Sequence, residues 1–168
     1  AAQLGGRVAP SAQREFGYLS EGEGRSEVVL GDARLSLERE SARNYDLIVI
    51  DAFSSDAIPT HLLTKEAMAV YLRHLHPDGI IAFHVTNRFL DLAPVVRAIA
   101  DVHGLTSVLV SDEVAEDDSL ASTDWALVSR DAARFKGDAV AGLVTPITPI
   151  PGLGAWTDDF NNLFRILK

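Results

Sequence analysis

The stretch that decides the fold runs from Asp46 to Asp56 and reads Asp-Leu-Ile-Val-Ile-Asp-Ala-Phe-Ser-Ser-Asp. Its four consecutive aliphatic residues, Leu47 to Ile50, are typical of a strand covered on both faces, as in the parallel sheet of an α/β domain. In open α/β sheets, ligands bind in the crevice beyond the carboxyl ends of the strands. Asp51 and Asp56 follow this strand directly, so they are the first candidates for functional residues.

Length and composition indicate a soluble globular protein with one domain. The 168 residues include 47% hydrophobic and 23% charged residues, which is ordinary for this class. The absence of cysteine excludes disulfides, a thiolate nucleophile and thiolate-ligated zinc. No apolar run is long enough to cross a bilayer and no signal-peptide layout is present, so we expect a cytoplasmic protein without a membrane segment. The formal charge of -9 disfavours nucleic acid as a partner and favours cationic ligands.

The chain alternates between predicted strands and helices. Residues 1–24 have no sustained period, so we expect an irregular lead-in with one helical turn near Ser11 to Tyr18, followed by a single α/β domain over residues 25–168. Strands are predicted at 27–30, 47–50, 80–85, 107–110 and 125–128. Short helical segments are predicted from 33 to about 41, from a cap at Thr64, and from a cap at Asp91 to a stop at Gly104.

Helical periodicity predicts which side chains of the two longer helices face the core. In the first, they are Met68, Tyr71, Leu72 and Leu75; in the second, which has Pro94 in its first turn, they are Leu92, Val95, Val96 and Ile99. Pro77-Asp78-Gly79 is a turn signal between the first helix and the strand at 80–85.

The last two predicted strands have no helical pattern between them. We therefore expect 107–110 and 125–128 to form an antiparallel pair that closes one edge of an otherwise parallel sheet. The segment from Thr145 to Gly154 is rich in Pro and Gly and is predicted to be irregular, and the final Leu163 to Leu167 is too short to classify.

The order of these elements and four segments resemble the spermidine synthase family, and most closely the spermidine synthase-like domains of bacteria. The segments are GDARLSLER (31–39), YDLIVIDAFSSDAIPTHLLTKEA (45–67), FHVTNR (83–88) and WTDDFNNLFRILK (156–168), within a likeness that runs from about Phe16 to Lys168. The resemblance implies a methyltransferase-like (Rossmann-like), mostly parallel sheet with helices on both faces and an antiparallel edge pair. It also implies transfer of an aminopropyl group from decarboxylated S-adenosylmethionine to a diamine.

The resemblance assigns roles to five residues. Asp51 would be the general base, Asp56 and Ser55 would bind the amine substrate, and Asp32 would bond the adenine amino group beside the Ala33 amide. A carboxylate suits an amine acceptor because it can bind the ammonium form and then take its proton. Decarboxylated S-adenosylmethionine or S-adenosylmethionine would be a co-substrate. No tightly bound cofactor and no metal are expected.

Each candidate also has a structural interpretation. Asp51 can tether the loop that follows it, Asp56 and Ser55 can hydrogen-bond the turn locally, and Asp32 can cap the next helix. His84 and Asn87 end a strand beside the crevice and can line it, although a lone histidine at a strand end is more often structural. Trp156 either closes over the crevice or pins the C-terminal segment to the body. The acidic residues between 113 and 118 fit a solvated loop and no metal-loop spacing.

The sequence departs from the family in two ways. It contains neither the glycine-rich loop after a first strand nor the acidic residue after a second strand that hold the nucleoside in family members, so it resembles the later part of such a domain. The loop from Asp51 to Asp56 is also wider than the Asp-Ser-Ser-Asp of polyamine-making members. Strands 27–30 and 47–50 would then either pair directly or be covered by a partner chain, and we expect a homo-oligomer.

Two rival functions remain open at this stage. One is a non-catalytic remnant that serves as a binding or oligomerisation module, which the missing glycine loop favours. The other is a hydrolase in which Asp51 accepts a phosphoryl group, which is disfavoured because Phe53 stands where such enzymes usually have a second Asp.

Overall fold

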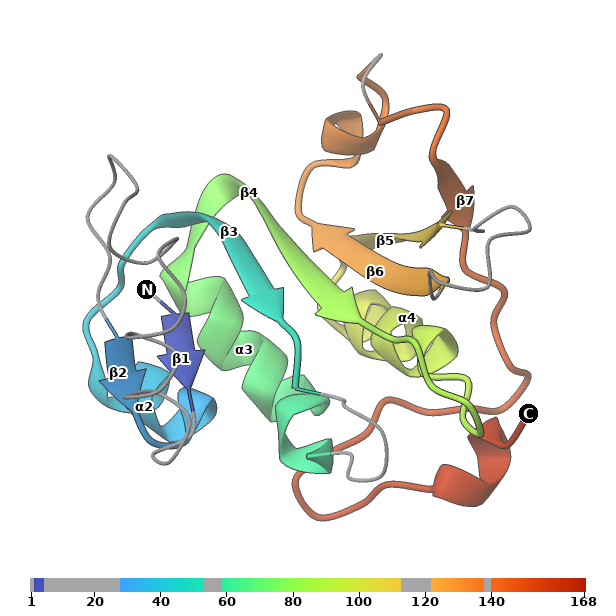
Figure 1. The fold of residues 1–168 in the computed structure, drawn as a ribbon, viewed down its shortest axis with the longest axis horizontal. Coiled ribbons are helices and arrows are strands. Elements are labelled where there is room, and N and C mark those ends of the chain that lie inside the picture. Colours follow the sequence, from blue (N-terminus) through green and yellow to red (C-terminus); the bar gives the residue numbers. More distant parts are fainter. Residues whose placement is uncertain (1, 5–27, 53–58, 113–121, 138–139) are drawn as a thin grey trace. The chain divides into compact units, whose positions relative to one another are not determined.

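The computed structural model describes residues 2–4, 28–52, 59–112, 122–137 and 140–168 (Figure 1). The chain forms two compact units, Ala1–Ser41 and Ala42–Lys168. The helical turn expected near Ser11 to Tyr18 lies outside the described residues, as do Ser55 and Asp56.

The smaller unit contains two short parallel strands and one helix. Strand β1 (Ala2–Leu4) pairs with β2 (Val28–Leu30), and helix α2 (Ala33–Arg39) follows after Gly31, so the predicted strand and short helix are confirmed. Among the described strands, β2 pairs with β1 and β3 pairs with β4, so the direct pairing considered for the strands at 27–30 and 47–50 is not found.

The larger unit is built on a five-stranded mixed sheet. Its strands are β3 (Tyr45–Ile50), β4 (Leu75–His84), β5 (Thr106–Asp112), β6 (Thr123–Ser129) and β7 (Val144–Pro146), in the spatial order β3-β4-β6-β5-β7. Only β3 and β4 are parallel neighbours; the other three pairings are antiparallel. The expectation of a mostly parallel sheet is therefore wrong.

The C-terminal strands also differ from the predicted edge pair. Strands β5 and β6 are antiparallel as predicted, but β6 is inserted between β4 and β5. The edge is formed by β7, in a segment that was predicted to be irregular. Pro146 is compatible with β7 because an edge strand can spare the N–H that proline lacks.

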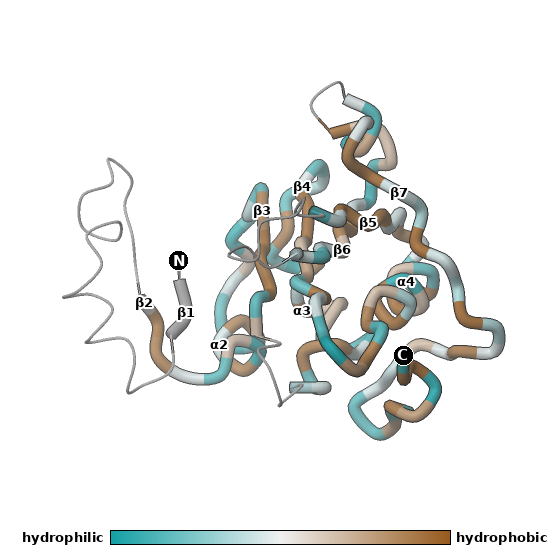
Figure 2. The backbone as a smooth tube through the Cα atoms, turned by 45° about the vertical axis from the view of Figure 1, so that its right-hand side comes forward, coloured by the Kyte–Doolittle hydropathy of each residue, from teal (hydrophilic) through white to brown (hydrophobic). Residues whose placement is uncertain are grey.

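Helices α3 (Lys65–His74) and α4 (Ala93–Val102) cover one face of this sheet. They pack against each other, α3 also against β4, and α4 against β5 and β6 (Figure 1). Strand β3 is hydrophobic along most of its length (Figure 2), but only one of its faces is covered. Ile48 and Ile50 are buried, whereas Leu47 and Val49 are 56% and 51% exposed. Among the described residues of this unit, both α-helices lie on one face of the sheet, and β3 is covered on one face and not on both as expected.

The two helices follow the predicted core patterns closely. Thr64 caps α3 by accepting the Ala67 N–H at 3.1 Å, and the inward-facing residues are buried, except that Leu72 is half-buried. Helix α4 buries all four predicted residues and is followed by Gly104 with a φ of +67°. Its N-cap is Leu92, however, and not the predicted Asp91.

A large bulge joins α3 to the sheet. Strand β4 begins at Leu75, directly after the helix, and its pairing with β3 jumps from Tyr45↔Leu75 to Leu47↔Ile80. The predicted turn at 77–79 is thus an excursion inside a strand. A side chain on Gly79 would come within 2.8 Å of the Leu75 side chain and 2.9 Å of the Tyr45 carbonyl oxygen, so the close approach requires glycine.

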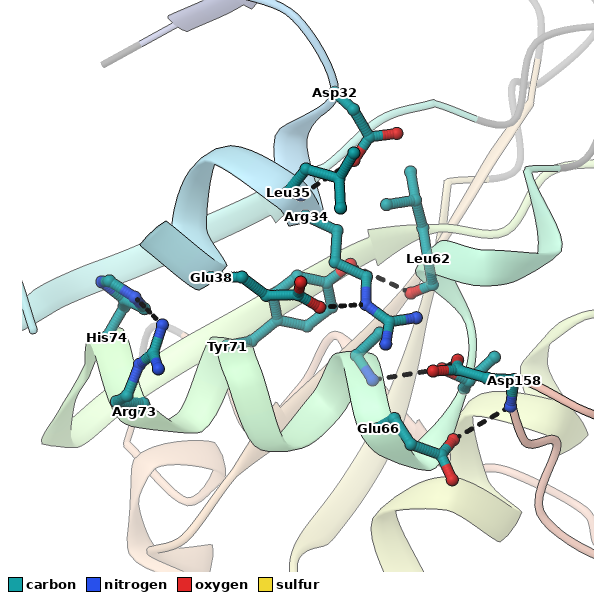
Figure 3. Close-up of polar contacts among 12 residues, drawn as sticks. Asp32, Arg34, Leu35, Glu38, Leu62, Glu66, Tyr71, Arg73, His74 and Asp158 are labelled. Carbon is teal, nitrogen blue, oxygen red and sulfur yellow. Dashed lines mark hydrogen bonds and ion pairs between the residues drawn. The ribbon is translucent and has the colours of Figure 1, made fainter. Parts of the chain in front are cut away.

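The C-terminal segment is fastened to the start of α3. Trp156 is 1% exposed and its carbonyl accepts the Lys65 N–H at 2.8 Å. The Asp158 carboxylate accepts a hydrogen bond from the Thr64 hydroxyl at 2.8 Å, and the Asp158 N–H donates to the Glu66 carboxylate at 3.1 Å (Figure 3).

The remaining described helical elements are short 3-10 turns: η2 (Thr60–Leu62), η3 (Ala132–Phe135) and η4 (Leu163–Ile166). None of the described helices has the length and hydropathy needed to cross a membrane.

Candidate functional site

One edge of the five-stranded sheet gathers polar side chains from four strands. Strands β3, β4 and β5 run in the same direction, and β6 runs against them, so the carboxyl ends of the first three meet the amino end of β6. Asp51 follows β3, His84 and Asp112 are the last residues of β4 and β5, and Asp124 is the second residue of β6. This is the edge at which ligands bind in open α/β sheets.

Asp51 and His84 are brought together by the register of β3 and β4. Ile50 pairs with Phe83, so the next residues of these parallel strands are neighbours. Asp51 Oδ1 lies 2.7 Å from His84 Nδ1, and the side chains are 61% and 23% exposed. The carboxylate therefore faces solvent while one of its oxygens is held by the imidazole.

His84 is fixed by three further residues. Its Nε2 lies 2.8 Å from Thr86 Oγ1, which accepts the Asp124 N–H at 2.7 Å. Its ring stacks on Trp125 of β6 with centroids 4.8 Å apart and an angle of 22° between the planes. The sequence singled out His84 but missed Thr86, Asp124 and Trp125. Of these three residues, Thr86 could have been found from the sequence, because it lies two residues after His84 at the end of the same predicted strand.

Two other residues near this edge have structural roles. The Asn87 side-chain oxygen accepts the N–H groups of Phe89 and Leu90, each at 2.9 Å, so Asn87 shapes the loop after β4. Trp156 is buried, which matches the expectation that it pins the C-terminal segment, and not the alternative that it closes over the crevice.

The predicted nucleoside-binding residues lie in the smaller unit, at the start of α2. Asp32 is the N-cap of this helix and its Oδ1 accepts the Leu35 N–H at 2.9 Å, while Ala33 is the first helical residue. The structure therefore shows the helix-capping role of Asp32. Within the described residues, no group of three or more His, Asp or Glu side chains is arranged to hold a metal ion.

Comparison with curated proteins finds a sequence relative, although no protein-family model matches the chain. A polyamine aminopropyltransferase from Vibrio vulnificus (strain CMCP6) is 36% identical over 61 residues, which are 35% of this chain and 19% of that protein. The matched segment thus spans about a fifth of the relative's length.

Solved structures share the fold over most of this chain. A probable spermidine synthase from Corynebacterium glutamicum ATCC 13032 has a TM-score of 0.60 and 16% identity, covering 96% of this chain and 64% of its own. A spermidine synthase in complex with the transition-state analogue AdoDATO has a TM-score of 0.60 and 18% identity, covering 80% and 48%. The spermidine synthase from Thermotoga maritima has a TM-score of 0.56 and 17% identity, covering 80% and 47%.

The chain spans between about half and two thirds of the length of these solved proteins. At these identities, the structural likeness establishes an α/β fold of the spermidine synthase, methyltransferase-like type. Taken with the sequence relative, it relates this chain to the spermidine synthase-like, or polyamine aminopropyltransferase, family.

Proposed function

We propose that this chain is a spermidine synthase-like transferase domain, which moves an aminopropyl group from decarboxylated S-adenosylmethionine to a diamine or a related amine. The observation that carries the proposal is the state of Asp51 at the carboxyl end of β3. One carboxylate oxygen is held by His84, the side chain is 61% exposed, and the other oxygen has no partner among the described residues. That oxygen is available to an incoming amine.

The reaction requires a base because an acceptor amine is an ammonium ion near neutral pH. Asp51 takes one proton from this ammonium group, and the nitrogen lone pair then attacks the carbon beside the sulfonium of the co-substrate. The new C–N bond forms as the C–S bond breaks, and the sulfur keeps the electron pair in the departing methylthioadenosine. The proton remains on Asp51 until solvent removes it.

The charge along the sheet edge supports a cationic acceptor. Asp112 and Asp124 share this edge with Asp51, and the whole chain carries a formal charge of -9. Carboxylates in a row raise the local concentration of a polyamine and disfavour anionic ligands. Asp56 and Ser55 would bind the amine, and Asp32 and Ala33 would bind the nucleoside, as the family resemblance implies.

Replacing Asp51 by Asn tests the proposal. An amide keeps the size of the carboxylate but cannot take a proton from an ammonium group, so turnover should fall by about 10²- to 10⁴-fold while nucleoside affinity stays nearly unchanged. Asp46→Asn is the matched control, since Asp46 is an exposed aspartate near the opposite end of the same strand. Aminopropyl transfer is measured by chromatography of the polyamine product.

Two further variants separate the proposed roles. Asp56→Asn should chiefly raise the KM of the amine acceptor, and Asp32→Ala should weaken nucleoside binding. If Asp51→Asn retains near-normal turnover, Asp51 only tethers its loop and the proposed mechanism is wrong.

The rival function, a non-catalytic binding or oligomerisation module, is favoured by the exposed apolar face of β3. Leu47 and Val49 project from an edge strand, where another chain can cover them. Titration calorimetry with methylthioadenosine and an assay of transfer distinguish the two functions. The rival requires that neither nucleoside binding nor transfer be detected.

A further inference from the structure

We propose that His84 is a positioning residue for Asp51: the carboxylate selects the tautomer that carries its proton on Nδ1, and Thr86 holds the ring in place by donating to Nε2. The inference deepens the proposed function and rests on it, because it assigns to His84 the orientation of the proposed base. No role for His84 follows from the resemblance to the family; the role follows from the contacts on both sides of the ring.

The donors and acceptors around the ring determine where its proton lies. The Asp124 N–H can only donate, so it takes one acceptor position of Thr86 Oγ1. The Thr86 hydroxyl keeps its own proton, which it donates to Nε2 of the neutral imidazole. An ionised carboxylate can only accept, so Nδ1 carries the ring proton and donates it to Asp51.

The resulting chain of hydrogen bonds has one direction. It runs from the Asp124 backbone through Thr86 and His84 to Asp51, and every group in it donates to the next. Because the chain begins at a backbone N–H of β6, its starting point is fixed by the sheet. The hydrogen bond to Nε2 fixes the direction in which the imidazole ring points, and so keeps Nδ1 facing Asp51.

The plane of the ring is fixed as well. His84 and Trp125 are paired across β4 and β6, and their rings stack. The imidazole is 23% exposed, whereas the carboxylate that it holds is 61% exposed. The protein thus orders an otherwise exposed aspartate through a better-buried neighbour.

This arrangement has a consequence for the reaction. An unrestrained aspartate at a strand end samples several side-chain rotamers, and only some of them point an oxygen at the acceptor. The bond from Nδ1 holds Oδ1, so Oδ2 is directed to one place. Orientation of a reacting group in this manner contributes to the rate and not to substrate affinity.

The first test requires no activity and uses the full 168-residue chain. Long-range ¹H–¹⁵N NMR of the imidazole rings, with His84 assigned by the spectrum lost in His84→Gln, reports which nitrogen is protonated. At a pH where the ring is neutral, Nδ1 should carry the proton in the unmodified protein and in Thr86→Ser. Thr86→Val should leave the proton on Nδ1, which the Asp51 carboxylate still requires, but should shift the Nε2 resonance because its hydrogen-bond donor is lost.

A matched control is available on the edge strand. Thr145→Val also removes a hydroxyl, from an exposed residue whose bond to the Leu109 carbonyl is 3.4 Å long, and it should leave the His84 spectrum unchanged. A proton on Nε2 of His84 in the unmodified protein would overturn the inference, whatever the outcome of activity assays.

The second test is kinetic. His84→Ala should lower kcat by about tenfold, with little change in the acceptor KM, because the bond to a charged group is lost. His84→Gln should recover most of the turnover, since a carboxamide can donate to Asp51 and accept from Thr86. Equal losses in both variants, or a change in KM alone, contradict a positioning role.

The two tests fail independently. If the unmodified protein transfers no aminopropyl group, the proposed function is wrong, and the NMR result still decides whether His84 holds Asp51. If transfer is measured and the tautomer is reversed, the proposed function stands and the role of His84 does not.

Discussion

Substitution of Thr64 by Val tests how the C-terminal segment is held. Thr64 is 2% exposed, and its hydroxyl both accepts the Ala67 N–H at 3.1 Å and donates to Asp158 at 2.8 Å. Valine keeps the size and β-branching of the side chain but makes neither bond. Loss of a helix N-cap costs about 1 kcal/mol. The bond to Asp158 adds about another 1 kcal/mol, below the usual range for a charged acceptor, because Asp158 is exposed.

The expected loss is therefore about 2 kcal/mol in the free energy of unfolding, or roughly 4–8 °C in Tm for a chain of this size. Urea unfolding followed by circular dichroism measures the first quantity. Thr145→Val, at an exposed position with one long hydrogen bond, is the control and should change stability by less than about 0.5 kcal/mol.

A double-mutant cycle isolates the contact to Asp158. Thr64→Val should cost about 1 kcal/mol less when Asp158 is already replaced by Ala, because the shared bond is lost only once. Strict additivity of the two substitutions would refute the assigned contact, and a loss below about 0.5 kcal/mol for Thr64→Val alone would refute the capping role as well.

Two other predictions concern the sheet. Gly79→Ala should destabilise the protein by about 1–3 kcal/mol, since the added carbon meets the Leu75 side chain and the Tyr45 carbonyl. Gly137→Ala is the control and should be nearly neutral, because its added carbon meets nothing within 4 Å. Equal effects of the two substitutions in chemical denaturation would contradict the close approach at Gly79. We also expect sedimentation to show a dimer or larger assembly that Leu47→Lys shifts toward monomer, because Leu47 is exposed on an edge strand; a clean monomer of the unmodified chain at tens of micromolar contradicts this.

Local signals in the sequence predicted the helices well. The cap at Thr64, the apolar spacing along α3 and α4 and the stop at Gly104 depend on residues within a few positions of one another. The prediction that Asp91 caps α4 was wrong, and Asp91 takes part in a contact with a distant part of the chain. The Asp91 N–H pairs with the Ile166 carbonyl at 2.7 Å, beside the isolated bridge between Leu90 and Leu167, and the helix starts one residue later than predicted.

The order of the strands could not be predicted from local patterns. Strand β6 lies between β4 and β5 because it pairs with both, and nothing in its own sequence shows a second partner. Strand β7 has three residues, one of them proline, and is a strand only because β5 offers it an edge. Four aliphatic residues in β3 likewise do not distinguish one covered face from two.

The candidate site could be predicted only where it depends on the ends of the strands, and not where it depends on the position of β6. Asp51 follows β3 and His84 is the last residue of β4; because these strands are parallel neighbours, the two residues meet, and the sequence pointed to both. Thr86, Asp124 and Trp125 join them through the antiparallel insertion of β6, which the sequence did not reveal. The roles of Ser55, Asp56, Asp32 and Ala33 stay predictions.

The insertion of β6 also determines where the chain can change without disturbing the sheet. Asp112 at the end of β5 pairs with Thr123 at the start of β6, so the connection between them leaves and returns at the edge that carries Asp51. The register of β5 and β6 is set by their own seven paired residues, and not by the number of residues that join them. A lineage could therefore change the length of this connection while the hydrogen bonds between β5 and β6 stay the same.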